Sequence, residues 1–294
     1  MMNNGWKTVV IDNHVSIGYE NGNMLVEGDD KKYIPVSQMK TLIINSSQTR
    51  ITSHLLTELC TNKVKIILCD HKHNPISEVV GYNDNCQTAG RMKEQVEWKH
   101  EEKERMWGKI VISKIKVQNG LLIYLGFGNN ALMNNYISEV EPGDPSNREG
   151  QAARIYFNTI FGKGFIRNSE NDLNAMLNYG YTILLSAFNR VVTAYGYHTA
   201  LGMKHCSTFN PYNLSSDLME PFRPFVDMIA LRNINKALDQ NTKKQLIEMT
   251  YKKMIFGGKK MELQVALEAY INQIMKNMGN KDYLIPSIGF ADER

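Results

Sequence analysis

Short apolar runs, each bounded by polar or turn-forming residues, occupy the first part of the chain. Runs of this length that are rich in β-branched residues are typical of strands. The pair Asn21-Gly22 separates two of them, and both residues tolerate the positive φ angles of a tight hairpin turn. A helical period over 52–61 lies between two later runs, with Thr52 or Ser53 as its candidate N-cap. The expected strands cover residues 6–12, 15–20, 24–27, 41–45, 64–69 and 76–81.

From about Ala89 onward, the apolar positions follow a helical period instead. The segment 92–116 is highly charged, but apolar residues such as Trp98 and Trp107 mark one face of the predicted helix. We therefore predict an α+β fold, with a small β-rich domain over residues 1–85 followed by a large all-α domain over residues 86–294. The expected helices cover residues 92–116, 119–139, 150–161, 171–195, 217–238, 242–254 and 261–278.

Composition narrows the class of protein. Of 294 residues, 43% are hydrophobic and 22% are charged, as in globular proteins with a sizeable core. The longest apolar run, 121–127, is far shorter than a membrane-spanning helix, and the first residues lack the layout of a signal peptide. We expect a cytoplasmic protein without a membrane partner. A net charge of +4 and a pI near 8.7 are compatible with nucleic acid but do not require it.

The cysteines give no sign of a disulfide framework or a zinc ribbon, because none of them forms a C-x-x-C pair. Reduced, mostly buried thiols are expected. The Cys-Asp-His-Lys-His cluster at 69–73 has soft-metal ligands, but it follows a strand and precedes Asn74-Pro75, which favours a strand end and a turn. The four cysteines are Cys60, Cys69, Cys86 and Cys206.

The first candidate site is the stretch 143–157, in which turn-forming residues lead into a helix. A carboxylate that points from this helix toward the interior is costly unless it is paired or bound to metal. The alternative is that Glu149 lies in the first helical turn and only complements the helix dipole. Spacing alone leaves both interpretations open. The residues that share a helix face with Glu149 are Ala152, Ala153, Tyr156 and Ile160.

Two further segments carry groups of the same kind. His205 follows the long helix expected over 171–195, and a single histidine in such a place more often has a purely structural role. Asp217 and Glu220 are three residues apart, so they share a face if they are helical. Pro221 is tolerated only near a helix start, which places Glu220 near that end. The alternative is two acidic residues favoured by the dipole of a first turn.

Together the three segments supply two or three carboxylates and one imidazole, all near helix ends. Oxygen-rich sets of this kind suit Mg²⁺, and one histidine is compatible with Mn²⁺. Such ions activate a hydroxyl nucleophile and stabilise the leaving oxygen in phosphoryl transfer. The sequence therefore indicates a Mg²⁺ or Mn²⁺ site for phosphodiester chemistry.

At these residues the sequence resembles the integrase family of CRISPR adaptation, the metal-dependent enzymes that insert captured DNA into a CRISPR array. The three segments resemble those that carry the family's catalytic glutamate, its histidine and its third acidic residue. In this chain these residues are Glu149, His205 and Glu220, with Asp217 alongside in a supporting role. The matching segments are G-D-P-S-N-R-E-G-Q-A-A-R-I-Y-F at 143–157, G-M-K-H at 202–205 and N-L-S-S-D-L-M-E-P-F-R-P at 213–224.

The resemblance covers nearly the whole chain and implies an assembly. The domain over 1–85 would join two copies into a homodimer, and the domain over 86–294 would be catalytic. Two dimers would flank a central dimer of a small ferredoxin-like adaptation protein in a hetero-hexamer. The length resembles the form found in systems with a single large effector nuclease. That nuclease and a further adaptation subunit are therefore candidate partners.

The resemblance also implies the substrate and the roles of the site residues. The substrate would be DNA: the 3′-hydroxyls of a short prespacer duplex would attack phosphodiesters at the ends of the CRISPR repeat. Glu149, His205 and Glu220 would be both catalytic and metal-binding. Basic residues beside them that are candidate DNA contacts are Arg148, Lys204 and Arg223. Basic residues elsewhere that are expected along the duplex are Lys109, Lys114, Lys116, Lys163 and Arg167.

Two other functions remain open at this point. The same residues would serve a metal-dependent, structure-specific endonuclease that cuts branched DNA without joining strands. A non-catalytic DNA-binding scaffold is the third possibility. The set of Glu149, His205 and Glu220 argues against it, because a scaffold has no need of buried carboxylates.

Overall fold

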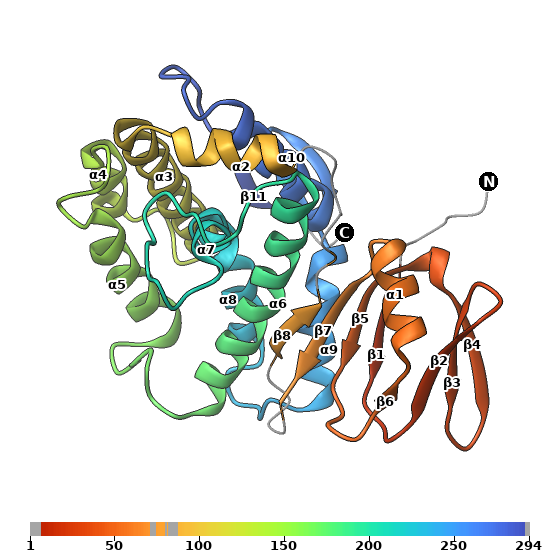
Figure 1. The fold of residues 1–294 in the computed structure, drawn as a ribbon. Helices are drawn as coiled ribbons and strands as arrows, with labels where there is room; N and C mark the ends of the chain where they lie inside the picture. The colour runs from red at the N-terminus through yellow and green to blue at the C-terminus, as the bar shows by residue number, and fades with distance from the viewer. Residues whose placement is uncertain (1–6, 71–74, 80, 82–87, 292–294) are drawn as a thin grey trace. The chain divides into compact units, whose positions relative to one another are not determined.

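The computed structural model describes residues 7–70, 75–79, 81 and 88–291. The chain divides into two compact units, Met1–Cys86 and Gln87–Arg294, one residue after the boundary expected from the sequence (Figure 1). The first unit is β-rich and the second is largely helical. The predicted α+β fold class is therefore confirmed.

Two four-stranded sheets form the N-terminal unit. In the first sheet three strands are parallel, and the edge strand β8 is antiparallel to its neighbour. In order across the sheet, these strands are β1 (Lys7–Ile11), β5 (Met39–Ile44), β7 (Lys65–Cys69) and β8 (Pro75–Val79). The second sheet consists, in order, of β4 (Lys31–Pro35), β3 (Asn23–Glu27), β2 (Ser16–Glu20) and β6 (Arg50–Ile51).

The predicted hairpin is present as β2–β3. Its turn residues Asn21 and Gly22 have φ angles of 48° and 81°, the left-handed conformations that a two-residue turn requires. Helix α1 (Ser53–Thr61) follows Thr52, whose hydroxyl accepts the N–H of Leu55 at 3.3 Å. Strand β4 was not predicted because its first three residues are exposed and polar or aromatic, so it shows no apolar period. His71 and His73 of the 69–73 cluster lie outside the described residues.

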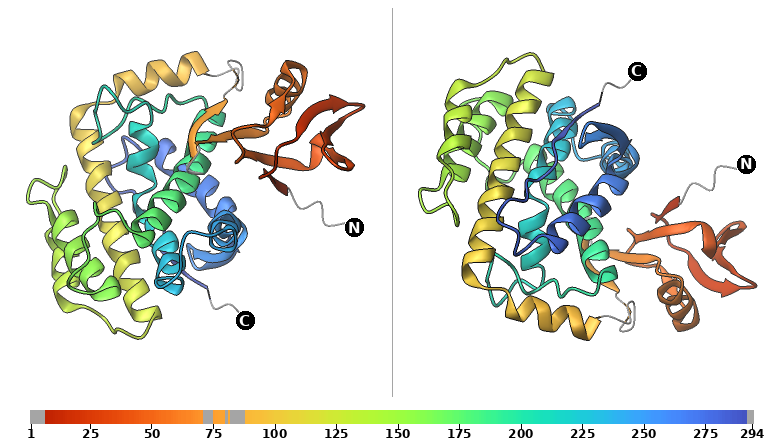
Figure 2. Two further views of the ribbon diagram at one scale, coloured as in Figure 1. Left: turned by 90° about the horizontal axis from the view of Figure 1, so that it is seen from below. Right: turned by 90° about the horizontal axis from the view of Figure 1, so that it is seen from above.

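The C-terminal unit contains helices that range from one and a half to seven turns. Figure 2 shows α3, α4 and α5 side by side within this unit. The helices described are α2 (Thr88–Glu97), α3 (His100–Tyr124), α4 (Ala131–Glu139), α5 (Arg148–Phe161), α6 (Asp172–Ala194), α7 (Asn213–Leu218), α8 (Arg223–Arg232), α9 (Gln240–Glu248) and α10 (Leu263–Lys276). Short 3₁₀ turns are η1 (Val36–Gln38) in the first unit, and η2 (Glu220–Phe222) and η3 (Met249–Tyr251) in the second.

Several predicted helix boundaries in this unit are wrong. The helix expected over 217–238 is replaced by α7, the 3₁₀ turn η2 and α8, and α8 ends at Arg232. The segment 92–116 breaks at Lys99, where the Glu102 carboxylate accepts the Lys99 N–H at 3.0 Å and starts a new helix. Helix α3 then continues past 116 and ends before Gly126 and Gly128, whose φ angles of 85° and 83° are incompatible with a helix.

A small three-stranded sheet lies in the unit that was expected to be all-helical. Strands β9 (Lys253–Phe256) and β10 (Lys259–Glu262) form a hairpin across Gly257-Gly258, where both φ angles are positive. Strand β11 (Ile288–Phe290) pairs with β9 from the other side. The helices expected over 242–254 and 261–278 end or begin at other residues than predicted. The first gives way to η3 and β9, and the second begins only after β10.

Helix α6 is the buried centre of the helical unit. Thirteen of its 23 residues are buried. A Cβ at Gly180 would lie 2.4 Å from Val226 on α8 and 3.0 Å from Leu246 on α9, so the glycine permits this close packing. Among the described residues, no helix is long and apolar enough to cross a membrane.

Candidate active site

The turn before α5 fixes the position of Glu149. Asp144 and Asn147 have φ angles of 50° and 53°, a left-handed conformation that Asp and Asn tolerate. The Asp144 carboxylate accepts the N–H groups of Arg148 at 2.9 Å and Glu149 at 3.0 Å. The Asn147 side chain accepts the N–H of Gly150 at 3.1 Å. Two side chains thus cap the helix, and Glu149 lies in its first turn, as the alternative interpretation required.

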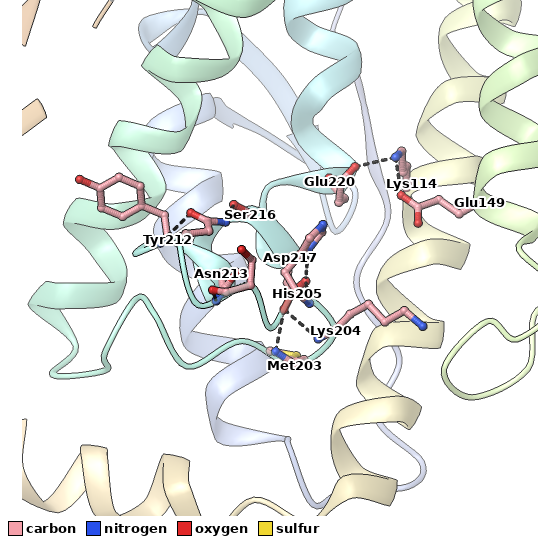
Figure 3. A network of polar contacts seen from close by, with 12 residues as sticks. Lys114, Glu149, Met203, Lys204, His205, Tyr212, Asn213, Ser216, Asp217 and Glu220 are labelled. Carbon is pink, nitrogen blue, oxygen red and sulfur yellow. Dashed lines mark hydrogen bonds and ion pairs between the residues drawn. The ribbon is translucent and has the colours of Figure 1, made fainter. Parts of the chain in front are cut away.

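The carboxylates of Glu149 and Glu220 both contact the ammonium group of Lys114 (Figure 3). Lys114 Nζ lies 2.6 Å from Glu149 Oε1 and 2.5 Å from Glu220 Oε2. The second oxygen of Glu220 contacts Arg223 at 2.8 Å. The exposed fractions of the side chains are 24% for Glu149, 11% for Lys114 and 5% for Glu220. Three elements, α3, α5 and η2, therefore meet at one buried ion cluster.

Glu220 and Lys114 are both held in their charged forms. Burial alone would raise the pKa of Glu220, but Arg223 and Lys114 outweigh it, and the pKa lies below its ordinary value. Burial alone would lower the pKa of Lys114, but Glu220 and Glu149 outweigh it, and that pKa lies above its ordinary value. Each buried charge in the cluster is thus balanced by neighbours of opposite sign.

His205 lies in the loop between α6 and α7, and the loop wraps around the carboxylate of Asp217. Asp217 is fully buried and accepts the N–H groups of Met203 at 2.6 Å, Lys204 at 3.0 Å and His205 at 3.1 Å. A Cβ at Gly202 would lie 2.3 Å from the His205 carbonyl oxygen and 2.9 Å from Asp217 Oδ2. Only glycine fits there, because the backbone passes so close to the carboxylate.

The same carboxylate orients the imidazole. Asp217 Oδ1 lies 2.5 Å from His205 Nδ1 (Figure 3). Trp107 packs edge-on against the imidazole ring at a centroid distance of 5.9 Å. The hydrogen bond to Asp217 outweighs burial and raises the pKa of His205. A proton on Nδ1 satisfies this contact and leaves Nε2 with its lone pair. That arrangement, a histidine whose other nitrogen binds a carboxylate, is common among metal-binding histidines.

The donor chemistry fits a divalent cation. Glu149 and Glu220 already turn one oxygen each toward a single positive charge, the Lys114 ammonium. Oxygen donors with one imidazole suit Mg²⁺ or Mn²⁺. Over the described ranges, however, no three His, Cys, Asp or Glu side chains stand close enough together to form a ready-made cage for an ion.

A further buried carboxyl group, that of Asp227, was not identified from the sequence. Asp227 on α8 accepts hydrogen bonds from Tyr156 at 2.8 Å and from Tyr181, both fully or nearly fully buried. Burial raises the pKa of Asp227 to about 6, despite these hydrogen bonds. The Arg223 guanidinium lies 4.8 Å from the centre of the Tyr181 ring, so it links the two carboxyl groups.

The basic residues expected to contact DNA have protein partners. Arg148 contacts Glu139 at 2.8 Å, and the Lys204 ammonium donates to the Gly143 carbonyl at 2.9 Å. Arg223 contacts Glu220, as described above. A role for these three in DNA binding stays a prediction.

Lys114 was expected along a DNA duplex, and this prediction is wrong because its side chain is buried between two glutamates. The sequence did carry a signal. Trp107, Ile110 and Val111 precede Lys114 at helical spacing on the apolar face of α3, so a lysine on that face needs a buried anion.

Comparisons with known proteins agree with this architecture. Residues 8–253 match the family model described as CRISPR associated protein Cas1, and the chain therefore belongs to the Cas1 family. It is 28% identical over 286 residues to the CRISPR-associated endonuclease Cas1 of Neisseria meningitidis serogroup C (strain 8013), across 94% of this chain and 93% of that relative. The family predicted from the three segments is confirmed.

Solved structures show the same fold at lower identity. A Cas1 protein from Thermotoga maritima superposes with a TM-score of 0.73 and 15% identity, over 98% of this chain and 100% of that one. A casposase bound to integration product has a TM-score of 0.71 and 14% identity, over 95% of this chain and 92% of that one.

Proposed function

We propose that the chain is a divalent-metal-dependent DNA integrase that inserts short duplex fragments into a CRISPR array. Membership of the Cas1 family supports a role in CRISPR adaptation. The fold shared with a casposase bound to integration product supports strand joining. The observation that carries the proposal is the convergence of Glu149 and Glu220, from separate elements, on one cation position.

In this proposal Glu149, Glu220 and Nε2 of His205 hold the ion. Mg²⁺ or Mn²⁺ supplies Lewis acidity, which favours the deprotonated 3′-hydroxyl and neutralises charge on the phosphate. Asp217 has its oxygens engaged by the loop N–H groups and His205 Nδ1, so it orients the histidine and does not bind the ion. Glu220 is therefore the acidic ligand of its segment.

The polypeptide itself contributes positioning. The Asp144 cap holds the start of α5 and with it Glu149. The loop around Asp217 holds the imidazole, and Trp107 limits its rotation. Because these contacts are made within the protein itself, little reorganisation is needed when charge develops on the phosphate.

The proposed partners follow from the family and its relatives. Structures titled "Cas6-RT-Cas1--Cas2 complex" contain chains of this fold in an assembly with other proteins. We propose that this chain acts in the cytoplasm as a homodimer and assembles with a small ferredoxin-like companion into a hetero-hexamer on prespacer and repeat DNA. Arg148, Lys204 and Arg223 would contact phosphates after exchanging their present partners.

A DNA-joining assay tests the proposal. The protein and its small companion are incubated with a labelled duplex that has free 3′-hydroxyls and a supercoiled plasmid that carries a CRISPR array, with and without Mn²⁺. Label should enter the plasmid only with metal and should be lost in His205→Ala. The control His100→Ala, an 84% exposed side chain at the start of α3, should join normally. Joining that survives in EDTA or in His205→Ala would contradict the proposal.

The second candidate is a metal-dependent, structure-specific endonuclease that acts on branched DNA. The names of several relatives, CRISPR-associated endonuclease Cas1, favour cleavage as an activity. The same assay separates the two, because an endonuclease yields cut branched DNA and no label on the plasmid. DNA binding with neither activity would leave the non-catalytic scaffold.

A further inference from the structure

Lys114 is the least expected residue of the active site. It belongs to the interior of the 25-residue helix α3, and only 11% of its side chain is exposed. Its ammonium contacts one oxygen from each of Glu149 and Glu220, which come from other elements 35 and 106 residues away in sequence. Figure 3 shows the ammonium between the two carboxylates.

Two carboxylates that approach each other away from bulk water repel, and each loses hydration. A lysine ammonium offsets both effects, since it is a compact positive charge with three N–H donors. Together with Arg223, which contacts the second oxygen of Glu220, Lys114 balances the charges of the two carboxylates. A divalent ion that binds the same two carboxylates must compete with the ammonium, because two cations that share these oxygens repel each other.

We propose that Lys114 is a built-in cation of the active site. Its ammonium holds Glu149 and Glu220 together in the metal-free protein, and a divalent ion binds only by displacing it from these oxygens. Lys114 is thus a positioning residue that sets the metal affinity. This inference rests on the proposed function in one respect, namely that Glu149 and Glu220 are metal ligands.

A purely structural role for Lys114 would lead to a different effect on metal affinity. If Lys114 only stabilised the fold, its loss would weaken the protein and leave metal affinity unchanged or reduced. If it competes with the ion, its loss weakens the metal-free protein and strengthens metal binding. The two effects have opposite signs, and a purely structural ion pair would not strengthen metal binding.

The experiment compares Lys114→Met with Lys116→Met in the full chain without DNA. Lys116 is exposed on the same helix, so its variant is matched in size and charge. Free Mn²⁺ is measured by electron paramagnetic resonance during titration, and the melting temperature is measured in EDTA and in saturating Mn²⁺. We expect Lys114→Met to lower the Mn²⁺ Kd on the order of tenfold, a typical size for coupling between sites. Lys116→Met should match the wild type.

The melting temperatures provide an independent readout. Lys114→Met should melt below the wild type in EDTA, and Mn²⁺ should raise its melting temperature by more than it raises that of the wild type. Should this variant fold poorly, Lys114→Gln keeps N–H donors without the charge and should also tighten Mn²⁺ binding. The increase in Mn²⁺ affinity should disappear when Glu220→Gln is added to either variant, since one of the two shared carboxylates then loses its charge.

Three outcomes would overturn the inference. The first is an unchanged or raised Mn²⁺ Kd in both Lys114 variants while the wild type binds Mn²⁺ and joins DNA, which leaves the proposed function intact. The second is tighter binding that persists with Glu220→Gln, which places the ion elsewhere. The third is no Mn²⁺ binding by any variant, which removes the proposed metal site as well.

Discussion

Two buried carboxyl groups, seven residues apart in sequence, lie in different electrostatic environments. Glu220 contacts two cations, Lys114 and Arg223, and its pKa lies below the ordinary value. Asp227 contacts two phenol hydroxyls, and burial raises its pKa to about 6. Both are almost inaccessible to solvent. Burial alone therefore does not decide the charge of a carboxyl group; the kind of partner does.

The difference separates two roles. A carboxylate held in its charged form is ready to bind a cation, whereas one held by hydroxyl groups can exist as a neutral acid near pH 6. Arg223 contacts Glu220 and lies over the Tyr181 ring, so it belongs to both environments. Variants that neutralise each carboxyl group, or that remove Arg223, test whether the two groups differ in role.

Neutralising Glu220 should have the largest effect. In Glu220→Gln the shape is kept but the charge that would bind the ion is lost. We expect DNA joining to fall by about 100-fold or more, as for loss of a group that stabilises transition-state charge. The matched control is Asp227→Asn, an equivalent change outside the ion cluster, which should retain most of its joining rate. Equal losses in both variants would show that the two carboxyl groups do not differ in role.

Removing Arg223 should destabilise the protein. Arg223→Met leaves Glu220 with a single cation and removes the contact with the Tyr181 ring. We expect the free energy of unfolding in urea to fall by about 3 kcal/mol, the cost of breaking a buried ion pair. Arg154→Met, on the exposed side of α5, should change it by less than about 0.5 kcal/mol. Similar values for the two variants would contradict a stabilising role for the buried pair.

The raised pKa of Asp227 predicts a specific pH dependence. In the unfolded chain an aspartate ionises near pH 4, whereas in the folded protein it ionises near pH 6. The stability that Asp227 contributes is fully present below the unfolded pKa, near pH 4, and is lost as pH rises from 4 through 6. Relative to Asp227→Asn, the wild-type free energy of unfolding should therefore fall by about 2 kcal/mol over this interval. A constant difference between pH 4 and 7 would rule out the raised pKa.

The smallest effect should come from a single hydroxyl. Tyr156→Phe removes one of the two hydrogen bonds to Asp227, and we expect a loss of about 1 kcal/mol in the free energy of unfolding. Tyr270→Phe is the matched control. In the structure as described, its buried hydroxyl has no hydrogen-bond partner, so that variant should be neutral or slightly more stable. A neutral Tyr156→Phe would show that Tyr181 alone satisfies the carboxyl.

The features that could be predicted from the sequence depend on residues close together in the chain. The β2–β3 hairpin could be recognised because Asn21-Gly22 favours one turn type. Glu149, His205 and Glu220 could be listed as candidates because each lies in a short, recognisable segment. Asp217 contacts His205, and its supporting role stays a prediction.

The features that sequence reasoning missed depend on distant partners. The position of Lys114 on an apolar helix face called for a buried anion, but the sequence could not name it, because Glu220 lies 106 residues away. Asp227 resembled an ordinary helical aspartate, because its partner Tyr156 is 71 residues away. Strand β11 has only three residues, too few to show a period, and forms by pairing with β9.

The loop that carries His205 should open only slowly, because its backbone amides bind a buried side chain. Its amides at Met203, Lys204 and His205 all donate to a carboxylate that has no contact with solvent. Amide hydrogens in loops usually exchange with water quickly, whereas these three can exchange only when the Asp217 side chain is released. They should therefore retain their protons in deuterated water for minutes to hours, like the amides of a packed helix. The residue proposed for catalysis would then belong to one of the slowest-opening loops of the molecule.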